Sequence, residues 1–407
     1  MTSMDRTQYN FVGIDLHKMN HVAILCNCFG EPIKTFTIKN SPNYFPKFLE
    51  NVLKASKDKA VIFGLEDVNF YGRSLAKFLI DQNQQVKEVN SAWTKKRRNA
   101  GINKSKTDKN DAHLICKNLI NELDSMPTAN PVDFYMAVRQ TLTSRNHYIQ
   151  MITSLKNSIH NMLIHHYANY TDFFKDFESR TARGFFIKYP SPDLLQGVSQ
   201  ESLQKYLKEF NRSAPKDLSA KILKAVEKNG WMDTGYQEER NMLIKTHLEN
   251  MENLIGTVKD LESKLEVLVG QSDYPLKSIP GIDTVLAATL IASIGDINRF
   301  SNSGKLAKLA GIAPYEHSSG QSVKKYSNKL GNRELHKAFY AMTLTHIRKE
   351  ANPIMYEYYQ KKIAEGRKKK QAMVCVMRRL VNIVYSVMKH KRPYEQPTRC
   401  QDEQNSA

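Results

Sequence analysis

The order of apolar runs in the first 125 residues constrains the fold of this chain more than any other feature of the sequence. Residues 10–16 predict a buried strand with an acid near its end, and the short apolar run 60–65 is typical of a central strand. Further strands are predicted at 21–28, 33–38 and 86–89, and helices at 44–55, around 75–79 and from 108 onward. The resulting order, β-β-β-α-β-α-β-α, predicts a mixed α/β domain that ends near residue 125.

The middle of the chain shows helical spacing. Residues 135–168 and 200–228 look helical, and between 240 and 270 the apolar residues step by fours and threes with one break, at Glu262. The members of this series are Ile244, Leu248, Met251, Ile255, Val258, Leu265 and Val269. Two interpretations stay open: the series is the seam of a coiled coil or helical hairpin, or it is one face of a long helix that packs on its own domain.

Turn residues and composition indicate where domains begin and end. Pro275 and the turn that ends at Gly281 terminate the long helical stretch. We therefore expect an α/β domain followed by all-α parts, with boundaries at 1–125, 126–274 (helical and coiled-coil) and 275–395 (helical C-terminal domain). The polar residues 396–407 are expected to form a disordered tail.

The charge balance points to a polyanionic partner. The 407 residues include 60 Lys plus Arg against 41 Asp plus Glu, a net charge of +19. Nucleic acid is the usual partner of such a chain, and an anionic membrane surface is the rival. No apolar stretch approaches the ~18 to 20 residues of a membrane span, and the start of the chain holds no apolar signal segment. The five cysteines form no C-x-x-C pair, so neither a zinc site nor a disulfide framework is predicted, and a cytoplasmic location is expected.

Four acids stand at positions where they can converge. Asp15 lies at the end of the first strand, and Glu66 follows the central apolar run. Asp108 and Asp111 lie three residues apart at the start of a helix, so both carboxylates can face the same side. Hard divalent cations bind oxygen ligands of this kind, and two such ions about 4 Å apart would hold a phosphate and activate a water or hydroxyl. These four residues are the predicted metal ligands and catalytic acids.

Each acid also has an ordinary structural explanation. Asp15 alone would be a turn or capping residue, and Glu66 alone a solvated strand end. Asp108 would be an N-cap or first-turn residue whose charge suits the helix dipole, with Asp111 an ordinary first-turn acid. The combined pattern is more specific than any one member.

Three segments, Val12–Lys18, Glu66–Tyr71 and Lys106–Ala112, carry a resemblance to a known family. They resemble the DEDD-type insertion-sequence transposases, which include the Piv invertases and the bridge-RNA-guided recombinases. The resemblance implies an N-terminal RuvC-like domain with a ribonuclease-H fold, in which the four acids named above bind Mg²⁺ or Mn²⁺. Asn69 stands where the family usually has Gly.

The C-terminal part resembles the transposase domain of the same family through Gly311–Pro314, His317–Gly320 and Gly331–Leu335. By that resemblance Ser319, which precedes a glycine, is the nucleophile that attacks DNA. From the residues alone, Ser319 and its neighbours would form a flexible polar turn. A serine hydroxyl also needs a base or a metal to become a good nucleophile.

In the C-terminal part, one position departs from the family pattern and one turn gives only a weak signal. His336 stands where the family commonly has Arg, which puts a phosphate contact there in doubt. The turn Ser278–Asp283 resembles a helix-hairpin-helix element, whose backbone N–H groups bind phosphate.

Two clusters of basic residues are predicted to bind nucleic acid. The first precedes the acidic pair and consists of Lys95, Lys96, Arg97, Arg98, Lys104 and Lys106. The second lies within 361–379 and includes Arg367, Lys368, Lys369, Lys370, Arg378 and Arg379. Either cluster alone would be an ordinary solvated face. Two of them, with a net charge of +19, favour nucleic-acid binding.

Three functions are compatible with these features. The first is a DNA recombinase that cuts and rejoins double-stranded DNA with the acidic site and Ser319. For it, the resemblance adds a non-coding guide RNA and homodimers that assemble into a homotetramer. The second is a junction-resolving endonuclease that uses the acidic site alone, and the third is a nucleic-acid-binding protein without catalysis. Ser319 separates the first two, because hydrolysis by water does not need it, and the four acids argue against the third.

Overall fold

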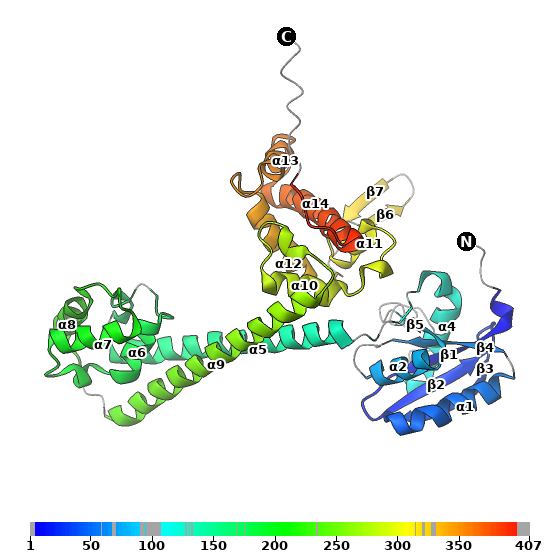
Figure 1. Cartoon of the computed structure of the whole chain (residues 1–407), viewed down its shortest axis with the longest axis horizontal. Coiled ribbons are helices and arrows are strands. Elements are labelled where there is room, and N and C mark those ends of the chain that lie inside the picture. Colours follow the sequence, from blue (N-terminus) through cyan, green and yellow to red (C-terminus); the bar gives the residue numbers. More distant parts are fainter. Residues whose placement is uncertain are drawn as a thin grey trace, which may run out of the picture. The chain divides into compact units, whose positions relative to one another are not determined.

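The computed structural model places most of the chain in regular structure. It describes residues 5–57, 59–66, 71–89, 94, 107–126, 128–129, 131, 133–167, 169–174, 176–232, 235–313, 315–319, 322–326 and 331–396. The chain divides into two compact units, one formed by 1–136 with 296–305 and the other by 137–295 with 306–407. Figure 1 labels the helices and strands of both units.

A five-stranded sheet forms the centre of the first unit. Its strands are β1 (Tyr9–Asp15), β2 (Asn20–Cys26), β3 (Pro32–Lys39), β4 (Ala60–Leu65) and β5 (Gln85–Glu88), in the order β3-β2-β1-β4-β5. The first three strands pair antiparallel, whereas β4 pairs parallel with both β1 and β5. The carboxyl ends of β1, β4 and β5 therefore lie at one edge of the sheet.

Helices cover both faces of this sheet (Figure 1). They are α1 (Phe45–Ser56), α2 (Arg73–Asp81) and α4 (Asp108–Glu122). Successive side chains of a strand point to opposite faces, and β1 shows the consequence. Val12 and Ile14 join the apolar core formed with α1 and α2, whereas Phe11 joins the core formed with α4. The mixed α/β order predicted for the first 125 residues is confirmed over the described part of this unit.

Two long helices, α5 (Asp133–His166) and α9 (Gln237–Gln271), form a hairpin in the second unit (Figure 1). Between them in sequence lie α6 (Arg180–Lys188), α7 (Gln200–Phe210) and α8 (Leu218–Asn229). We call these three helices the end module. Its apolar side chains share one core with the C-terminal half of α5 and the N-terminal half of α9.

The heptad-like series of α9 packs against its own chain. Ile244, Leu248 and Met251 are fully buried in the core shared with α5 and the end module. The break in the series is occupied by an ion pair, because Arg145 of α5 donates to the Glu262 carboxylate at 2.7 Å. Both interpretations of the series therefore apply: α9 forms a hairpin with α5 and packs on helices of its own unit. Its buried seam residues are not free to pair with a second copy.

The helical structure predicted over 200–228 is confirmed for most of this range, and the structure divides it into two helices separated at 211–217. The Ser213 N–H donates to the Asn211 side chain at 2.9 Å, which forms an Asx turn. Pro215 follows and cannot donate a helical hydrogen bond. Local turn chemistry thus overrides the helical spacing on either side.

The C-terminal helices are α10 (Thr284–Ile294), α11 (Ser303–Leu309), α12 (Arg333–His346), α13 (Pro353–Ala364) and α14 (Lys369–His390). The last of them contacts α12 and α13 and buries an apolar face on which Val376, Leu380 and Val384 are fully covered. The prediction of a wholly helical domain is corrected by a two-stranded antiparallel sheet of β6 (Tyr315–Ser319) and β7 (Ser322–Tyr326). Its strands are rich in Ser, His and Lys, so they lack the apolar alternation by which a strand is recognised.

Candidate functional site

Two predicted site residues lie at adjacent strand ends. Asp15 is the last residue of β1, and Glu66 directly follows β4. The two strands run parallel with Ile14 opposite Leu65, so the next residue of each strand emerges at the same edge. The sheet register therefore places these two acids side by side along the backbone, as expected for parallel strands.

The other two predicted acids lie in the first turn of α4. Thr107 is the N-cap, since its side chain accepts the Asn110 N–H at 3.2 Å. Asp108 is therefore not the cap but the first helical residue, and its side chain is 60% exposed. Asp111, three residues on, is buried.

The structure brings Asp15 and Asp108 together around a residue that the sequence pattern did not single out, His17. Its Nε2 atom lies 3.1 Å from Oδ2 of Asp15 and 3.4 Å from Oδ1 of Asp108. One potential ligand atom from each of the three residues lies within 4.8 Å of the other two. Glu66 and Asp111 are not members of this close group. Two of the four predicted acids thus meet directly in the described structure.

The charge of Asp111, the buried acid of α4, also acts on Asp15. Burial raises the pKa of the Asp15 carboxyl above its usual value. The charge and hydrogen bond of His17 act against this rise, whereas the charges of Asp111 and Asp108 add to it. Carboxylates that disfavour each other's ionisation are stabilised by a cation placed among them.

His17 is held in place from the strand side. Its backbone N–H donates to Nδ1 of His21 at 3.3 Å, and His21 itself is fully buried in β2. Burial lowers the pKa of His21, so this imidazole stays neutral and its Nδ1 can accept. Only its position in the sequence could have indicated His17. It lies two residues beyond Asp15, the acid at the strand end, and side chains two residues apart lie on the same side of an extended chain.

The donor set fits a divalent cation. Two carboxylates and an imidazole are ligands that Mg²⁺, Mn²⁺ and related ions accept in differing proportion. The negative charges of Asp111 and Asp108 act on Asp15, and a cation among these carboxylates would offset them. Together they suggest a divalent-metal site at the carboxyl end of β1.

A glycine pair sets how closely α4 approaches the sheet. Gly13 and Gly64 lie opposite each other on β1 and β4. A methyl group on Gly13 would lie 2.3 Å from the Ala112 carbonyl oxygen and 2.3 Å from the Cys116 nitrogen, both in the α4 backbone. Any side chain at Gly13 would therefore push away the helix that carries Asp108.

We expect Gly13→Ala to cost about 1–3 kcal/mol of stability, as overpacking does, and to weaken Mn²⁺ binding because α4 is displaced from Asp15. Gly64→Ala is the matched control, since its methyl would meet only the Leu119 and Val89 side chains, at 3.0 and 3.1 Å. Thermal unfolding and Mn²⁺ titration of both variants give the test. Equal metal affinity in wild type and Gly13→Ala would contradict the positioning role.

The predicted nucleophile lies in the other unit. Ser319 is the last residue of β6, opposite Ser322 of β7, so its backbone is part of a hairpin strand. The motif glycines around this hairpin have packing roles, since a methyl group on Gly331 would lie 2.3 Å from the Gly311 nitrogen. Nδ1 of His336 lies 3.0 Å from the Ala310 carbonyl oxygen. That contact gives His336 a structural role at the start of α12.

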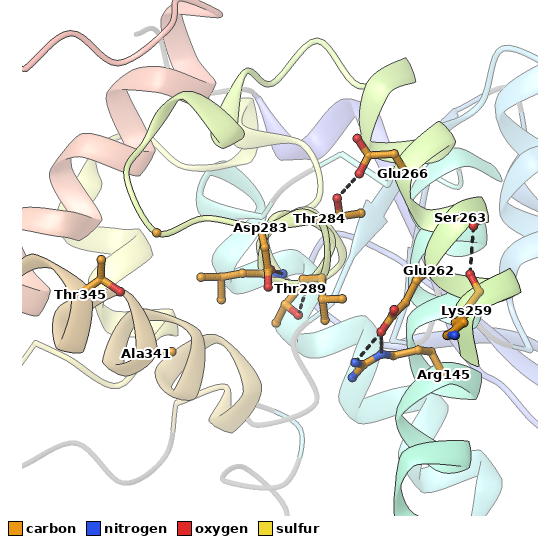
Figure 2. Close-up of a pocket in the computed structure, with 13 residues that line it drawn as sticks. Arg145, Lys259, Glu262, Ser263, Glu266, Asp283, Thr284, Thr289, Ala341 and Thr345 are labelled. Atoms are coloured by element: carbon orange, nitrogen blue, oxygen red, sulfur yellow. Dashed lines mark hydrogen bonds and ion pairs between the residues drawn. The ribbon is translucent and has the colours of Figure 1, made fainter. Parts of the chain in front are cut away.

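An open pocket of about 850 Å³ lies in the second unit beside α9, α10 and α12 (Figure 2). Its charged residues are Glu262, Glu266, Asp283, Arg145 and Lys259. The Asp283 carboxylate accepts a backbone N–H from the first turn of α10 at 2.7 Å. It therefore already caps the N-terminus of this helix. The acids outnumber the bases here, which argues against the phosphate-binding role expected for the neighbouring Ser278–Asp283 turn.

The structure describes only the second of the two predicted basic clusters. Lys95, Lys96, Arg97, Arg98, Lys104 and Lys106 lie outside the described residues. In the second cluster Arg367, Lys368, Lys369 and Lys370 are exposed where α13 leads into α14, and the Arg379 guanidinium lies 3.3 Å from the centre of the Tyr358 ring. Within the described residues no helix is long and apolar enough to cross a membrane.

Comparisons with known proteins find transposase families and relatives. A family described as "Transposase", that of the DEDD transposases of IS110 elements, matches residues 12–168, and one described as "Transposase IS116/IS110/IS902 family" matches 273–360. The uncharacterized protein of insertion element IS116 from Streptomyces clavuligerus is 23% identical over 94% of this chain and 95% of its own. The pilin gene-inverting protein of Moraxella bovis is 32% identical over 39% of this chain and 52% of its own.

These matches define a DNA transposase with recombinase-like relatives. More narrowly, the chain belongs to the DEDD-type IS110 transposase family. The first match contains all four predicted acids and the second contains Ser319.

Proposed function

We propose that this protein is a metal-dependent recombinase that cuts and rejoins double-stranded DNA when an insertion sequence moves. The observation that carries the proposal is the convergence of Asp15, His17 and Asp108 at the end of β1, in a chain of a transposase family. We infer that the first unit has the RuvC-like ribonuclease-H fold implied by the resemblance. The acids at the carboxyl ends of the adjacent parallel strands β1 and β4 support this inference.

The proposed cation is Mg²⁺ or Mn²⁺, held by Asp15, Glu66, Asp108 and Asp111 with His17 beside them. When bound, such a cation offsets negative charge on the phosphate and lowers the pKa of the attacking hydroxyl. The protein's own part is to hold the ligands in place. The Thr107 cap fixes the start of α4, and Gly13 fixes the distance of that helix from the sheet.

Ser319 is the proposed nucleophile. Its Oγ would form a bond to a DNA phosphorus while the bond from phosphorus to the departing sugar oxygen breaks. The serine proton passes to a base or to solvent, and the sugar oxygen takes up a proton. The equivalent sugar hydroxyl of the second cleaved duplex would then attack the phosphoserine link. It loses its proton to a base or to solvent, the new strand junction forms, and Ser319 Oγ leaves and takes up a proton, so no water is consumed.

The proposed partners follow from charge and from the family. Double-stranded DNA would contact the two basic clusters through its phosphates. The guide RNA and the homodimer that assembles to a homotetramer rest on the family resemblance. The α9 seam does not supply the dimer contact, because its buried residues are covered within the chain. The cytoplasm, at the nucleoid, is the proposed location.

Mapping a covalent protein–DNA adduct tests this function against the alternative, a junction-resolving endonuclease. We expect denatured reaction mixtures to contain protein bound to a DNA end, with mass spectrometry placing the link on Ser319. A hydrolytic endonuclease would cut at the acidic site without any adduct. The control variant is Ser318→Ala, which should keep the adduct; a link on Ser318 would move the assignment by one residue. Cleavage with no adduct would reject the recombinase mechanism.

A further inference from the structure

The end module carries a row of positive charge that the proposed catalytic function does not use. Residues 200–230 include seven basic and four acidic residues. On α8, Lys221, Lys224 and Lys228 are all exposed. At about 100° per residue these positions fall within ~60° of the helix circumference, so they form a single row. We call it the α8 lysine row.

The opposite face of α8 fixes the direction of this row. Ile222 and Ser219 are fully buried, and Ile222 belongs to the core that the end module shares with α5 and α9. The helix also contacts α7. Because α8 is held by that buried face, the three lysines are presented outward in one direction.

No acid neutralises the row within the described residues. Some other exposed lysines are paired, by contrast: Lys77 pairs with Asp81 at 2.8 Å, and Lys277 pairs with Glu266 at 2.5 Å. None of the three α8 lysines lies within 4.0 Å of a carboxylate oxygen of a described residue. The charge of the row is therefore available to a ligand.

The length and setting of the row indicate the ligand. Seven residues of helix span ~10 Å, and one nucleic-acid strand advances about 3.4 Å per phosphate, so the row matches about three phosphates. Arg212 and Lys216 extend the exposed charge in the turn before α8. Trp231 and Tyr236, just after α8, are 40% and 81% exposed, and exposed aromatic rings beside basic residues are typical of nucleic-acid surfaces.

We propose that the α8 lysine row binds the phosphate backbone of a nucleic acid, as a contact separate from the catalytic site and from the two basic clusters. The row lies outside both family matches, which cover 12–168 and 273–360. An anionic membrane surface fits less well, because membrane-surface helices insert an apolar face and that face of α8 is already buried.

The test compares two triple variants of the full chain in buffer without divalent metal. One carries Lys221→Gln, Lys224→Gln and Lys228→Gln; the other carries Lys47→Gln, Lys54→Gln and Lys57→Gln in and just after α1. The second set is also exposed and loses the same charge. Affinity is measured against salt for a short duplex DNA and for a stem-loop RNA, both of arbitrary sequence, and for vesicles rich in phosphatidylserine. Thermal unfolding confirms that each variant is folded.

For the α8 variant we expect the slope of log affinity against log salt to become shallower by about 2–3 on duplex DNA, since each phosphate contact contributes about 0.9. Between about 50 and 200 mM salt, wild-type affinity should fall roughly 40-fold more than that of the variant. A change with DNA alone, RNA alone or both supports the proposal and identifies the ligand. Equal changes in both variants, or a loss confined to the vesicles, would overturn it. Because the assay measures binding in buffer without divalent metal, the measured affinities do not depend on catalysis by the acidic site or by Ser319.

Discussion

Replacing Asp108 by alanine is expected to abolish DNA strand cleavage while leaving the protein folded. Its Oδ1 atom lies 3.4 Å from His17 Nε2 in the same group as Asp15, so the change removes a proposed ligand. The side chain is 60% exposed and is not the helix cap. Its contribution to stability is limited to the helix dipole, about 0.3–1 kcal/mol. Activity should fall at least ~1,000-fold, which corresponds to about 4 kcal/mol in the activation barrier.

A carboxylate of similar exposure provides the control. Asp124 is 62% exposed, lies in the short 3-10 helix that follows α4, and pairs with Arg6 at 3.1 Å. We expect Asp124→Ala to keep both cleavage and Mn²⁺ binding. Mn²⁺ titration by electron paramagnetic resonance, thermal unfolding and cleavage of a labelled duplex are measured for both variants. Full cleavage by Asp108→Ala, or by wild type in excess chelator, would contradict the metal mechanism.

The α/β unit was predictable because its central strands β1 and β4 are largely apolar and buried on both faces. The run 60–65 is a central strand between β1 and β5, and such strands stand out as short apolar runs without a polar face. The β6–β7 hairpin was missed for the opposite reason, because the sequences of its two strands are largely polar and lack apolar alternation. The split at 211–217 depends on one Asx turn and one proline, which helical periodicity does not register.

The candidate site was predictable where backbone geometry determines it. Asp15 ends β1, Glu66 follows the adjacent parallel strand β4, and Asp108 begins a helix packed on the same sheet. His17 was not predicted, because its place beside both carboxylates depends on the path of the chain after β1 and on its contact with His21. The packing role of Gly13 was also hidden, since a glycine in a strand does not reveal which backbone lies against it.

Ser319 and the acids lie in different units, so mixing two inactive proteins shows whether one chain completes the site of another. Two duplexes require four strand cleavages, and one serine per chain then requires four chains or repeated use of a site. We propose that the acids of one chain act with Ser319 of its partner. An Asp108→Ala chain retains its serine, and a Ser319→Ala chain retains its acids. A mixed dimer would therefore contain one complete composite site.

The mixing experiment has a signature beyond restored activity. With random exchange in a symmetric dimer, half of the dimers are mixed and each has one working site of two, so adduct formation should reach about a quarter of the wild-type level. The covalent DNA should be found only on the Asp108→Ala chain, which an affinity tag on the Ser319→Ala chain distinguishes by size. Each variant alone should form no adduct. If both variants are folded, exchange partners and bind DNA, yet no adduct forms, each chain must build its site from its own acids and its own serine.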